Sequence, residues 1–293
     1  MARRAYVQKD FRSDSLVKIE TANEIIDKYL AMNLRLTLRQ LYYQFVAHHG
    51  LPNTERSYQN LGKLISEARL AGLVDWSAIE DRGRVADEPR HWSSAKKLID
   101  VALDQFRLDR WKTQMHYVEL WVEKQALAGV LEPVAEKNHV TLMVNKGYSS
   151  QSAMYESAQR FLRRSDEVES SILLYLGDHD PSGEDMVRDV RDRLHLFGVR
   201  KLVVVKVALT MAQVKHYGPP PNPAKLTDSR AKGYVEKHGD ESWEVDALDP
   251  DVLVKLIQAH IDEFLNHDEM EKIVAKEEAQ KKRVREALAK ETW

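Results

Sequence analysis

Two aspartates separated by one residue are the side chains in this sequence best placed to do chemistry. Asp178 and Asp180 follow the apolar run 172–176, and Pro181 and Gly183 come directly after them. This pattern predicts a buried strand that ends where a helix begins, and α/β proteins place ligand sites at such strand ends. Carboxylate oxygens are the ligands that Mg²⁺ prefers, so we expect this pair to hold Mg²⁺, or Mn²⁺ in its place. The same residues also fit a turn that only caps a helix.

A third carboxylate, Glu123, ends an earlier predicted strand at 117–123. If the two strands are neighbours in a parallel sheet, Glu123 lies at the same edge as Asp178 and Asp180. Such a cluster can bind one or two Mg²⁺ ions, or use one carboxylate as an acid or base. The presence of Glu123 therefore favours a metal site over a simple helix cap.

The elements that must position these side chains alternate along the second half of the chain. Alternating strands and helices are typical of an α/β domain with a mostly parallel, Rossmann-like sheet. The hydrophobic pattern predicts strands at 117–123, 140–144, 171–176 and 201–207, with helices at 125–138, 150–164 and 183–196.

The first ninety residues have a different pattern, with apolar residues at helical spacing. It predicts helices at 15–31, at 58–69 and from Thr37 onward, followed by a charged loop or wing at 80–90. Three short helices before an extended segment are the order found in winged-helix modules. Further helices are expected at 93–108, from Asp249 onward and at 268–290.

Composition limits the class of protein. The chain has 293 residues, of which 43% are hydrophobic, and this is enough to build a sizeable core. It has no cysteine, which excludes disulfides, thiolate zinc sites and cysteine nucleophiles. No stretch approaches the roughly 18 apolar residues of a membrane span, so we expect a soluble, cytoplasmic protein with no membrane partner. The net charge of −2 does not exclude DNA, because a whole-chain sum hides local basic surfaces.

Three strand-end motifs together resemble the Toprim domain, most closely that of the topoisomerase VI A subunit and its meiotic double-strand-break relatives. The motifs are Glu123-Lys124, Lys146-Gly147-Tyr148 and 177–183, which reads Gly-Asp-His-Asp-Pro-Ser-Gly. The resemblance implies that Glu123, Asp178 and Asp180 hold Mg²⁺ beside the scissile phosphate. Lys124, Lys146 and Gly147 are candidate phosphate ligands, although helix capping explains the turn at 146–152 about as well.

The N-terminal module extends the resemblance. The A-subunit relatives carry a winged-helix domain with a Thr/Ser-x-Arg-x-x-Tyr-Tyr motif whose second aromatic attacks DNA, and this chain reads 37–43 as Thr-Leu-Arg-Gln-Leu-Tyr-Tyr. The resemblance implies that Tyr43 is the nucleophile. Arg39, one helical turn earlier, can stabilise phosphate charge. Tyr42 is expected to pack, and a structural role for both tyrosines is the alternative.

The resulting hypothesis is an α/β protein with a winged-helix-like module (1–90), a helical linker (91–116), a Toprim domain (117–210) and a mostly helical C-terminal extension (211–293). Its expected activity is Mg²⁺-dependent cleavage of the DNA backbone by tyrosine transesterification. The resemblance implies a homodimer, in which the tyrosine of one subunit meets the metal of the other. No ATPase motif is present, so ATP-driven strand passage would need a separate ATPase subunit. The alternatives are a hydrolytic nuclease, as in the OLD-type Toprim nucleases, and a non-catalytic DNA-binding accessory factor.

Overall fold

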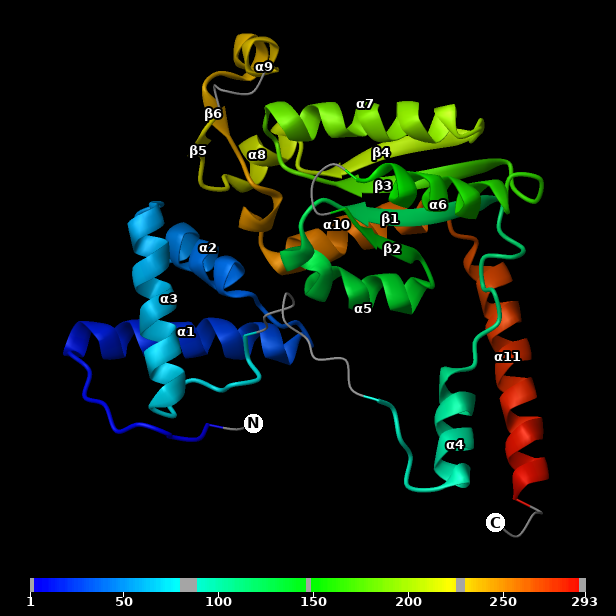
Figure 1. The fold of residues 1–293 in the computed structure, drawn as a ribbon, viewed down its shortest axis with the longest axis horizontal. Coiled ribbons are helices and arrows are strands. Elements are labelled where there is room, and N and C mark those ends of the chain that lie inside the picture. The colour runs from blue at the N-terminus through cyan, green and yellow to red at the C-terminus, as the bar shows by residue number, and fades with distance from the viewer. Residues whose placement is uncertain (1–2, 80–88, 146–148, 225–229, 290–293) are drawn as a thin grey trace.

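A computed structural model of the chain describes residues 3–79, 89–145, 149–224 and 230–289. Three helices form the N-terminal part, a parallel sheet between helices forms the centre, and the C-terminal segment returns across the sheet (Figure 1). Within the described ranges, no helix is both long and apolar enough to cross a membrane.

The N-terminal part contains the predicted helices α1 (Ser13–Ala31), α2 (Leu38–His48) and α3 (Glu55–Leu70). They pack on one another through buried apolar side chains such as Tyr29 and Leu41. Thr37 caps α2 as predicted: the Gln40 backbone N–H donates to its hydroxyl at 3.3 Å, and its own N–H donates to the Gln40 side chain at 2.8 Å. Residues 80–88, which make up most of the predicted wing, lie outside the described residues.

Four strands form the central sheet in the order β2-β1-β3-β4, and every pair is parallel. They are β1 (His116–Val122), β2 (Thr141–Val144), β3 (Ser170–Leu176) and β4 (Leu202–Ala208). All four predicted strands are confirmed to within one residue at each end. The prediction of a mostly parallel α/β sheet is therefore confirmed.

Helices cover both faces of this sheet (Figure 1). Leu174 and its even-numbered neighbours join a core with α5 (Ala128–Asn138) and α10 (Pro250–Asp262). Trp121 and Tyr175 join a second core with α6 (Gln151–Leu162) and α7 (Pro181–Leu196). Successive residues of a strand point to opposite faces, so the nearly continuous apolar run of β3 follows from burial on both sides.

The connections after β1 and β3 run in opposite directions. β1 is followed by the short 3₁₀ turn η1 (Gln125–Leu127) and α5 on the way to β2, whereas β3 is followed by α7 on the way to β4. The two strands lie side by side in the centre of the sheet. A crevice at the carboxyl ends of two such strands is the usual ligand position in open α/β sheets.

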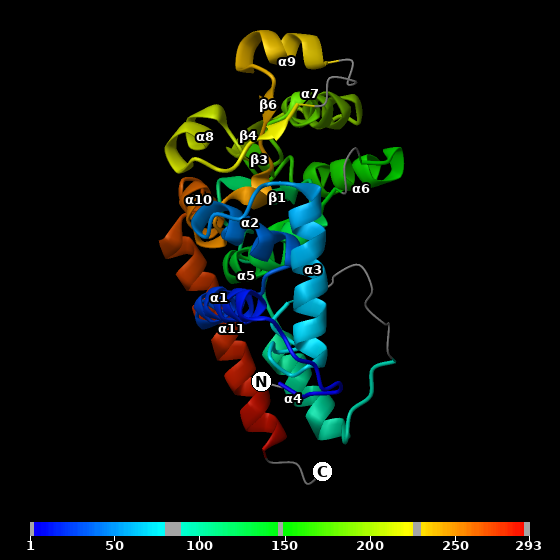
Figure 2. The same cartoon turned by 90° about the vertical axis from the view of Figure 1, so that its left-hand side faces the viewer.

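The C-terminal extension reaches back to this crevice. It begins with α8 (Met211–Tyr217), and a strand pair, β5 (Asn222–Pro223) and β6 (Glu241–Ser242), flanks α9 (Ala231–His238). A 3₁₀ turn, η2 (Val245–Ala247), then leads into α10, and η2 contacts α2. In the turned view α2 lies on the side of the helical part that faces α10 and the sheet (Figure 2). The Gln44 side chain donates to Asp249 at the start of α10 at 2.6 Å, and this contact joins the first and last parts of the chain.

Two further helices stand away from this body. The predicted linker helix, α4 (Ala95–Gln105), runs beside α11 (His267–Leu288), the last described helix (Figure 1). Arg285 of α11 donates to Asp104 of α4 at 2.9 Å. Buried Glu277 accepts from Arg110 at 2.9 Å and from the Leu108 backbone at 3.0 Å, so α11 is fixed to the segment that enters β1.

Candidate active site

The carboxyl ends of β1 and β3 bring together the strand-end residues singled out in the sequence. Val122 is in register with Leu176, and the backbone N–H of Glu123 donates to Leu176 O at 2.9 Å. The backbone N–H of Asp178 lies 3.4 Å from Glu123 Oε2. Glu123 and Asp178 therefore meet at one sheet edge, as expected for parallel neighbours.

Glu123 belongs to the α6/α7 side of the sheet edge. A Cβ on Gly177 would lie 2.7 Å from the Tyr175 ring and 3.1 Å from Glu123 Oε2, so the close approach of these groups requires glycine. Burial raises the pKa of Glu123, and the nearby Asp180 carboxylate raises it further. The buried hydroxyl of Tyr175 has no hydrogen-bond partner among the described residues. This side of the site therefore places the carboxylates of Glu123 and Asp180 near a Tyr175 hydroxyl that has no hydrogen-bond partner among the described residues.

Asp178 belongs to the opposite side and is more deeply held. Its Oδ1 accepts from the Val245 backbone N–H at 2.8 Å, and its Oδ2 lies 3.0 Å from the Lys124 ammonium. Burial raises the pKa of Asp178 to about 7; Lys124 opposes this change, while Asp246 and Glu123 add to it. Asp178 is therefore easier to protonate than an ordinary aspartate, because burial disfavours its charged form.

Asp180 has a structural task as well as its place beside Glu123. It is the N-cap of α7, and its Oδ1 accepts from the Gly183 backbone N–H at 2.6 Å and from the Ser182 hydroxyl at 2.9 Å. A Cβ on Gly183 would lie 2.2 Å from Asp178 O, so glycine is needed for the turn. The capping interpretation of the motif is therefore correct for Asp180, whereas Asp178 contacts Val245 and Lys124.

A second acidic pair, Glu244 and Asp246, completes the Asp178 side of the site. The residue between the two predicted aspartates, His179, pairs with Trp243 in an isolated antiparallel bridge. The His179 N–H donates to Trp243 O at 2.8 Å, and the Trp243 N–H donates to His179 O at 3.0 Å. This bridge brings residues 244–246 to the carboxyl ends of β1 and β3, where they contact Lys124. The sequence reasoning missed this pair, and its one signal was the acid-x-acid spacing it shares with Asp178 and Asp180.

Lys124 is the cation at the centre of this side. Its ammonium lies 3.0 Å from Asp178 Oδ2, 3.1 Å from Glu244 Oε2 and 2.9 Å from Asp246 Oδ1. Burial acts to lower the pKa of Lys124, but Asp246, Asp178 and Glu244 outweigh it and leave the pKa above its ordinary value. Lys124 is therefore a permanent positive charge bridging three carboxylates.

Helix α2 supplies the remaining residues from the other end of the chain. The Tyr43 hydroxyl donates to Glu244 Oε2 at 2.8 Å, and the Arg39 guanidinium pairs with the same carboxylate. Arg39 Nε also lies 3.4 Å from Asp246 Oδ2. The predicted nucleophile and its arginine therefore reach the strand-end site through Glu244 and Asp246, within a single chain.

The electrostatics of this contact keep Tyr43 protonated. Burial raises the pKa of the Tyr43 phenol, and Glu244 and Asp246 raise it further. For Glu244, burial acts to raise the pKa, but Lys124 and Arg39 outweigh it and lower the pKa to about 2. The resting arrangement is a neutral phenol that donates to a charged carboxylate.

Tyr42, the neighbouring tyrosine, packs as predicted. Its hydroxyl accepts from the Thr54 N–H at 2.9 Å and lies 3.2 Å from Pro52 O, and its ring meets Tyr58 edge to face. It therefore fixes the loop between α2 and α3. Lys146 and Gly147, the other candidate phosphate ligands, lie outside the described residues.

The carboxylates suit a hard divalent cation by their chemistry. Glu123, Asp178 and Asp180 offer only oxygen atoms, and burial, with a further contribution from neighbouring carboxylates, raises the pKa of Glu123 and of Asp178. Across the described ranges, no group of three or more histidine, cysteine or acidic side chains is already arranged around a metal position. Mg²⁺ does not require one, because it usually takes one or two carboxylates and completes its shell with water and substrate phosphate. The donor atoms therefore suit Mg²⁺ by their chemistry, whereas their arrangement among the described residues forms no site of three or more such ligands.

Comparison with protein-family models gives no match for this chain, and comparison with curated proteins gives none either. The site combines a phenol, a guanidinium, an ammonium and carboxylates from three separate parts of the sequence.

Proposed function

We propose that this protein cleaves the DNA backbone by tyrosine transesterification, as a Toprim protein of the topoisomerase VI A type. One observation carries the proposal: Tyr43 and Arg39 of α2 meet Lys124 and Asp178 of the sheet through Glu244. A phenol, two cations and a carboxylate set that suits Mg²⁺ are the groups that phosphoryl transfer to tyrosine needs. The winged-helix and Toprim assignments are part of this proposal.

In the proposed reaction, Tyr43 Oη attacks the phosphorus in line with the bond to be broken. A tyrosine-oxygen to phosphorus bond forms as the bond from phosphorus to a sugar oxygen breaks, and that oxygen takes a proton from water. The Tyr43 proton passes to Glu244 Oε2, its hydrogen-bond acceptor. Because the pKa of Glu244 is about 2 and that of Tyr43 is raised, the proton moves only as the new bond forms.

The remaining residues of the site would stabilise negative charge on the phosphate. Arg39 and Lys124 lie beside Glu244, where their positive charges can stabilise the phosphate oxygens. Glu123, Asp178 and Asp180 would hold Mg²⁺, which when bound supplies a Lewis acid next to the phosphate. A separate ATPase subunit would be the partner if cleavage serves ATP-driven strand passage.

A hydrolytic nuclease is the second candidate function. The observation that favours it is the burial of Tyr43, which is only 3% exposed and must move or be approached closely to reach a phosphate. In that reaction water attacks, and Tyr43 holds Glu244 in place. The third hypothesis is a non-catalytic DNA-binding accessory factor. It predicts that DNA binding survives loss of Glu123 and that no strand is cut with any divalent metal.

The deciding experiment incubates supercoiled plasmid with the protein and Mg²⁺ or Mn²⁺. The reaction is quenched with detergent and divided into samples with and without protease. Wild type is compared with Tyr43→Phe and Asp178→Asn, and Tyr155→Phe on the exposed surface of α6 is the matched control. We expect protein-linked ends that protease releases, present in wild type and in the control and absent in the other two variants.

Other outcomes identify the alternatives. Free ends that persist in Tyr43→Phe and disappear in Asp178→Asn identify a hydrolytic nuclease. DNA binding without cutting under either metal contradicts both enzyme functions for the isolated chain. That outcome would favour the non-catalytic accessory factor.

A further inference from the structure

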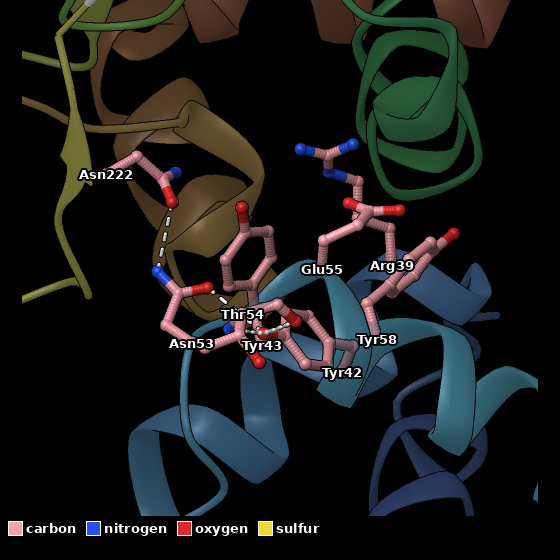
Figure 3. A pocket seen from close by; sticks show the side chains of 8 residues that line it. All are labelled: Arg39, Tyr42, Tyr43, Asn53, Thr54, Glu55, Tyr58 and Asn222. Atoms are coloured by element: carbon pink, nitrogen blue, oxygen red, sulfur yellow. Dashed lines mark hydrogen bonds between the residues drawn. The ribbon is translucent and has the colours of Figure 1, made fainter.

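A cavity opens directly beside the proposed nucleophile and shares Tyr43 and Arg39 with the carboxylate network. Its volume is about 220 Å³, and it lies between the start of α2, the start of α3 and strand β5 (Figure 3). Pockets for drug-sized molecules begin at roughly 300 Å³, so this one suits a single small ring system. The side chains that define it include Arg39, Tyr43, Asn53, Glu55, Tyr58 and Asn222.

The walls of the cavity are built by specific contacts. The Asn53 amide donates to Pro221 O at 2.9 Å and to Asn222 Oδ1 at 3.1 Å, which ties the loop after α2 to β5. The Tyr42 ring, with its hydroxyl fixed by this same loop, meets the Tyr58 ring edge to face at 5.4 Å. The shape is therefore held in place without a ligand.

The lining offers aromatic faces and polar edges but no aliphatic floor. Tyr58 is half-buried, and among the described residues its hydroxyl makes no hydrogen bond. Glu55 is an exposed carboxylate at the first turn of α3, and its only described side-chain partner is Gln59 at 3.0 Å. A flat group with amino and carbonyl edges matches such a lining, since proteins hold unstacked bases with aromatic side chains and with hydrogen bonds to the base edge.

The position of the cavity indicates which nucleotide of the DNA would supply the bound base. Tyr43 and Arg39 belong both to the cavity wall and to the contact with Glu244. A nucleotide whose base fills the cavity therefore places its own phosphate close to the Tyr43 hydroxyl. Glu55 can accept a hydrogen bond from an exocyclic amino group, as acidic side chains do from cytosine.

We propose that this cavity receives the base of the nucleotide flanking the scissile phosphate, extruded from the stack, and prefers amino-bearing bases to thymine. The inference rests on the proposed action on DNA and adds a base-binding subsite to it. Extrusion costs least where the base is mismatched. A mismatch at the extruded position therefore strengthens binding.

The test uses binding and does not depend on cleavage. Tyr43→Phe protein is titrated into short duplexes that carry 2-aminopurine in a matched or a mismatched pair. We expect 2-aminopurine fluorescence to rise on binding and affinity for the mismatched duplex to be higher by about tenfold, because a mismatched base costs less to extrude than a paired one. Adding Tyr58→Leu should abolish both effects. Adding Tyr155→Leu, which removes an exposed ring from α6, should leave both unchanged.

A second variant guards against misfolding of Tyr58→Leu. Glu55→Gln changes one exposed side chain, and it should keep the fluorescence rise but lose the preference for amino-bearing bases over thymine at the mismatch. Tight binding with no fluorescence rise, or a rise that survives Tyr58→Leu, overturns the base subsite while leaving DNA cleavage untouched. A fluorescence rise in a protein whose wild type never cuts DNA overturns the proposed function alone. Absence of DNA binding overturns both.

Discussion

Two acidic pairs with the same spacing meet at one sheet edge, and they do different work. Asp178 and Asp180 follow a buried strand and divide their tasks, because Asp178 contacts Val245 and Lys124 whereas Asp180 caps α7. Glu244 and Asp246 lie in a connecting segment and act together on the same cations, Lys124 and Arg39. An acid-x-acid motif alone therefore does not define a site. The backbone that carries the motif decides which carboxylate is available.

The largest expected effect tests whether the second pair joins Tyr43 to Asp178 within one chain. Tyr43→Phe and Asp178→Asn proteins, each inactive alone, are mixed in equal amounts and assayed for protein-linked DNA ends. We expect no recovery of activity, because the contacts through Glu244 are intrachain. Recovery would show instead that the tyrosine acts at the carboxylates of a partner subunit, as the family resemblance implies. Wild type diluted with either variant is the control for subunit exchange.

The next effect concerns the cation that the two pairs share. Lys124→Met removes the ammonium from between Asp178, Glu244 and Asp246, and so leaves buried Asp178 without a cation and the other two carboxylates with Arg39 alone. We expect the free energy of unfolding to fall by about 3–5 kcal/mol in urea titrations. Lys255→Met, which breaks an exposed ion pair with Asp251, should cost less than about 1 kcal/mol. Equal losses in the two variants would show that the network contributes nothing beyond a surface pair.

One carboxylate from each pair, Asp178 and Glu244, should also respond to pH with opposite signs. The pKa of Asp178 rises from about 3.9 in the unfolded chain to about 7 in the folded protein, so the folded state binds the extra proton between these values. Asp178 therefore lowers stability as pH rises from 4 to 7, and Asp178→Asn should flatten this part of the curve.

Glu244 behaves in the reverse way. Its pKa falls from about 4.3 in the unfolded chain to about 2 in the folded protein, so its stabilising contribution is present above pH 4 and is lost as pH falls towards 2. Glu244→Gln should remove that loss. Urea unfolding of both variants across pH 2–8 checks the signs, and the same slope in both variants would contradict the assignment.

The smallest effect separates the two tasks of Asp180. Asp180→Ala should lower the free energy of unfolding by about 1 kcal/mol, because it removes the cap of α7, whereas Asp180→Asn should cost less because asparagine caps nearly as well. The DNA-cleavage activity of Asp180→Asn is the measurement that separates the capping role from the metal-binding role. Full activity in this folded variant would limit Asp180 to capping, and lost activity would support its predicted role at the metal.

The sequence was sufficient to predict the sheet and one edge of the site. The continuous apolar run of β3 predicts a buried strand, and the meeting of Glu123 and Asp178 was expected on the condition that β1 and β3 are neighbours in a parallel sheet, which the structure shows. The resemblance selected Tyr43 and Arg39, but their distance from the crevice could not be predicted. That distance depends on the bridge between His179 and Trp243, which lie far apart in the sequence. Neither residue belongs to a strand with an apolar repeat, so the sequence contains no local signal for their pairing.

That same bridge makes the site discontinuous along the chain, with consequences for protein engineering. A fragment ending at residue 210 would keep all four strands and all three predicted metal ligands. It would nevertheless lose the Val245 N–H that holds Asp178, two of the carboxylates around Lys124, and helix α10, whose buried Leu253 and Ile257 cover one face of the sheet. The smallest transplantable unit therefore extends to about residue 262, where α10 ends.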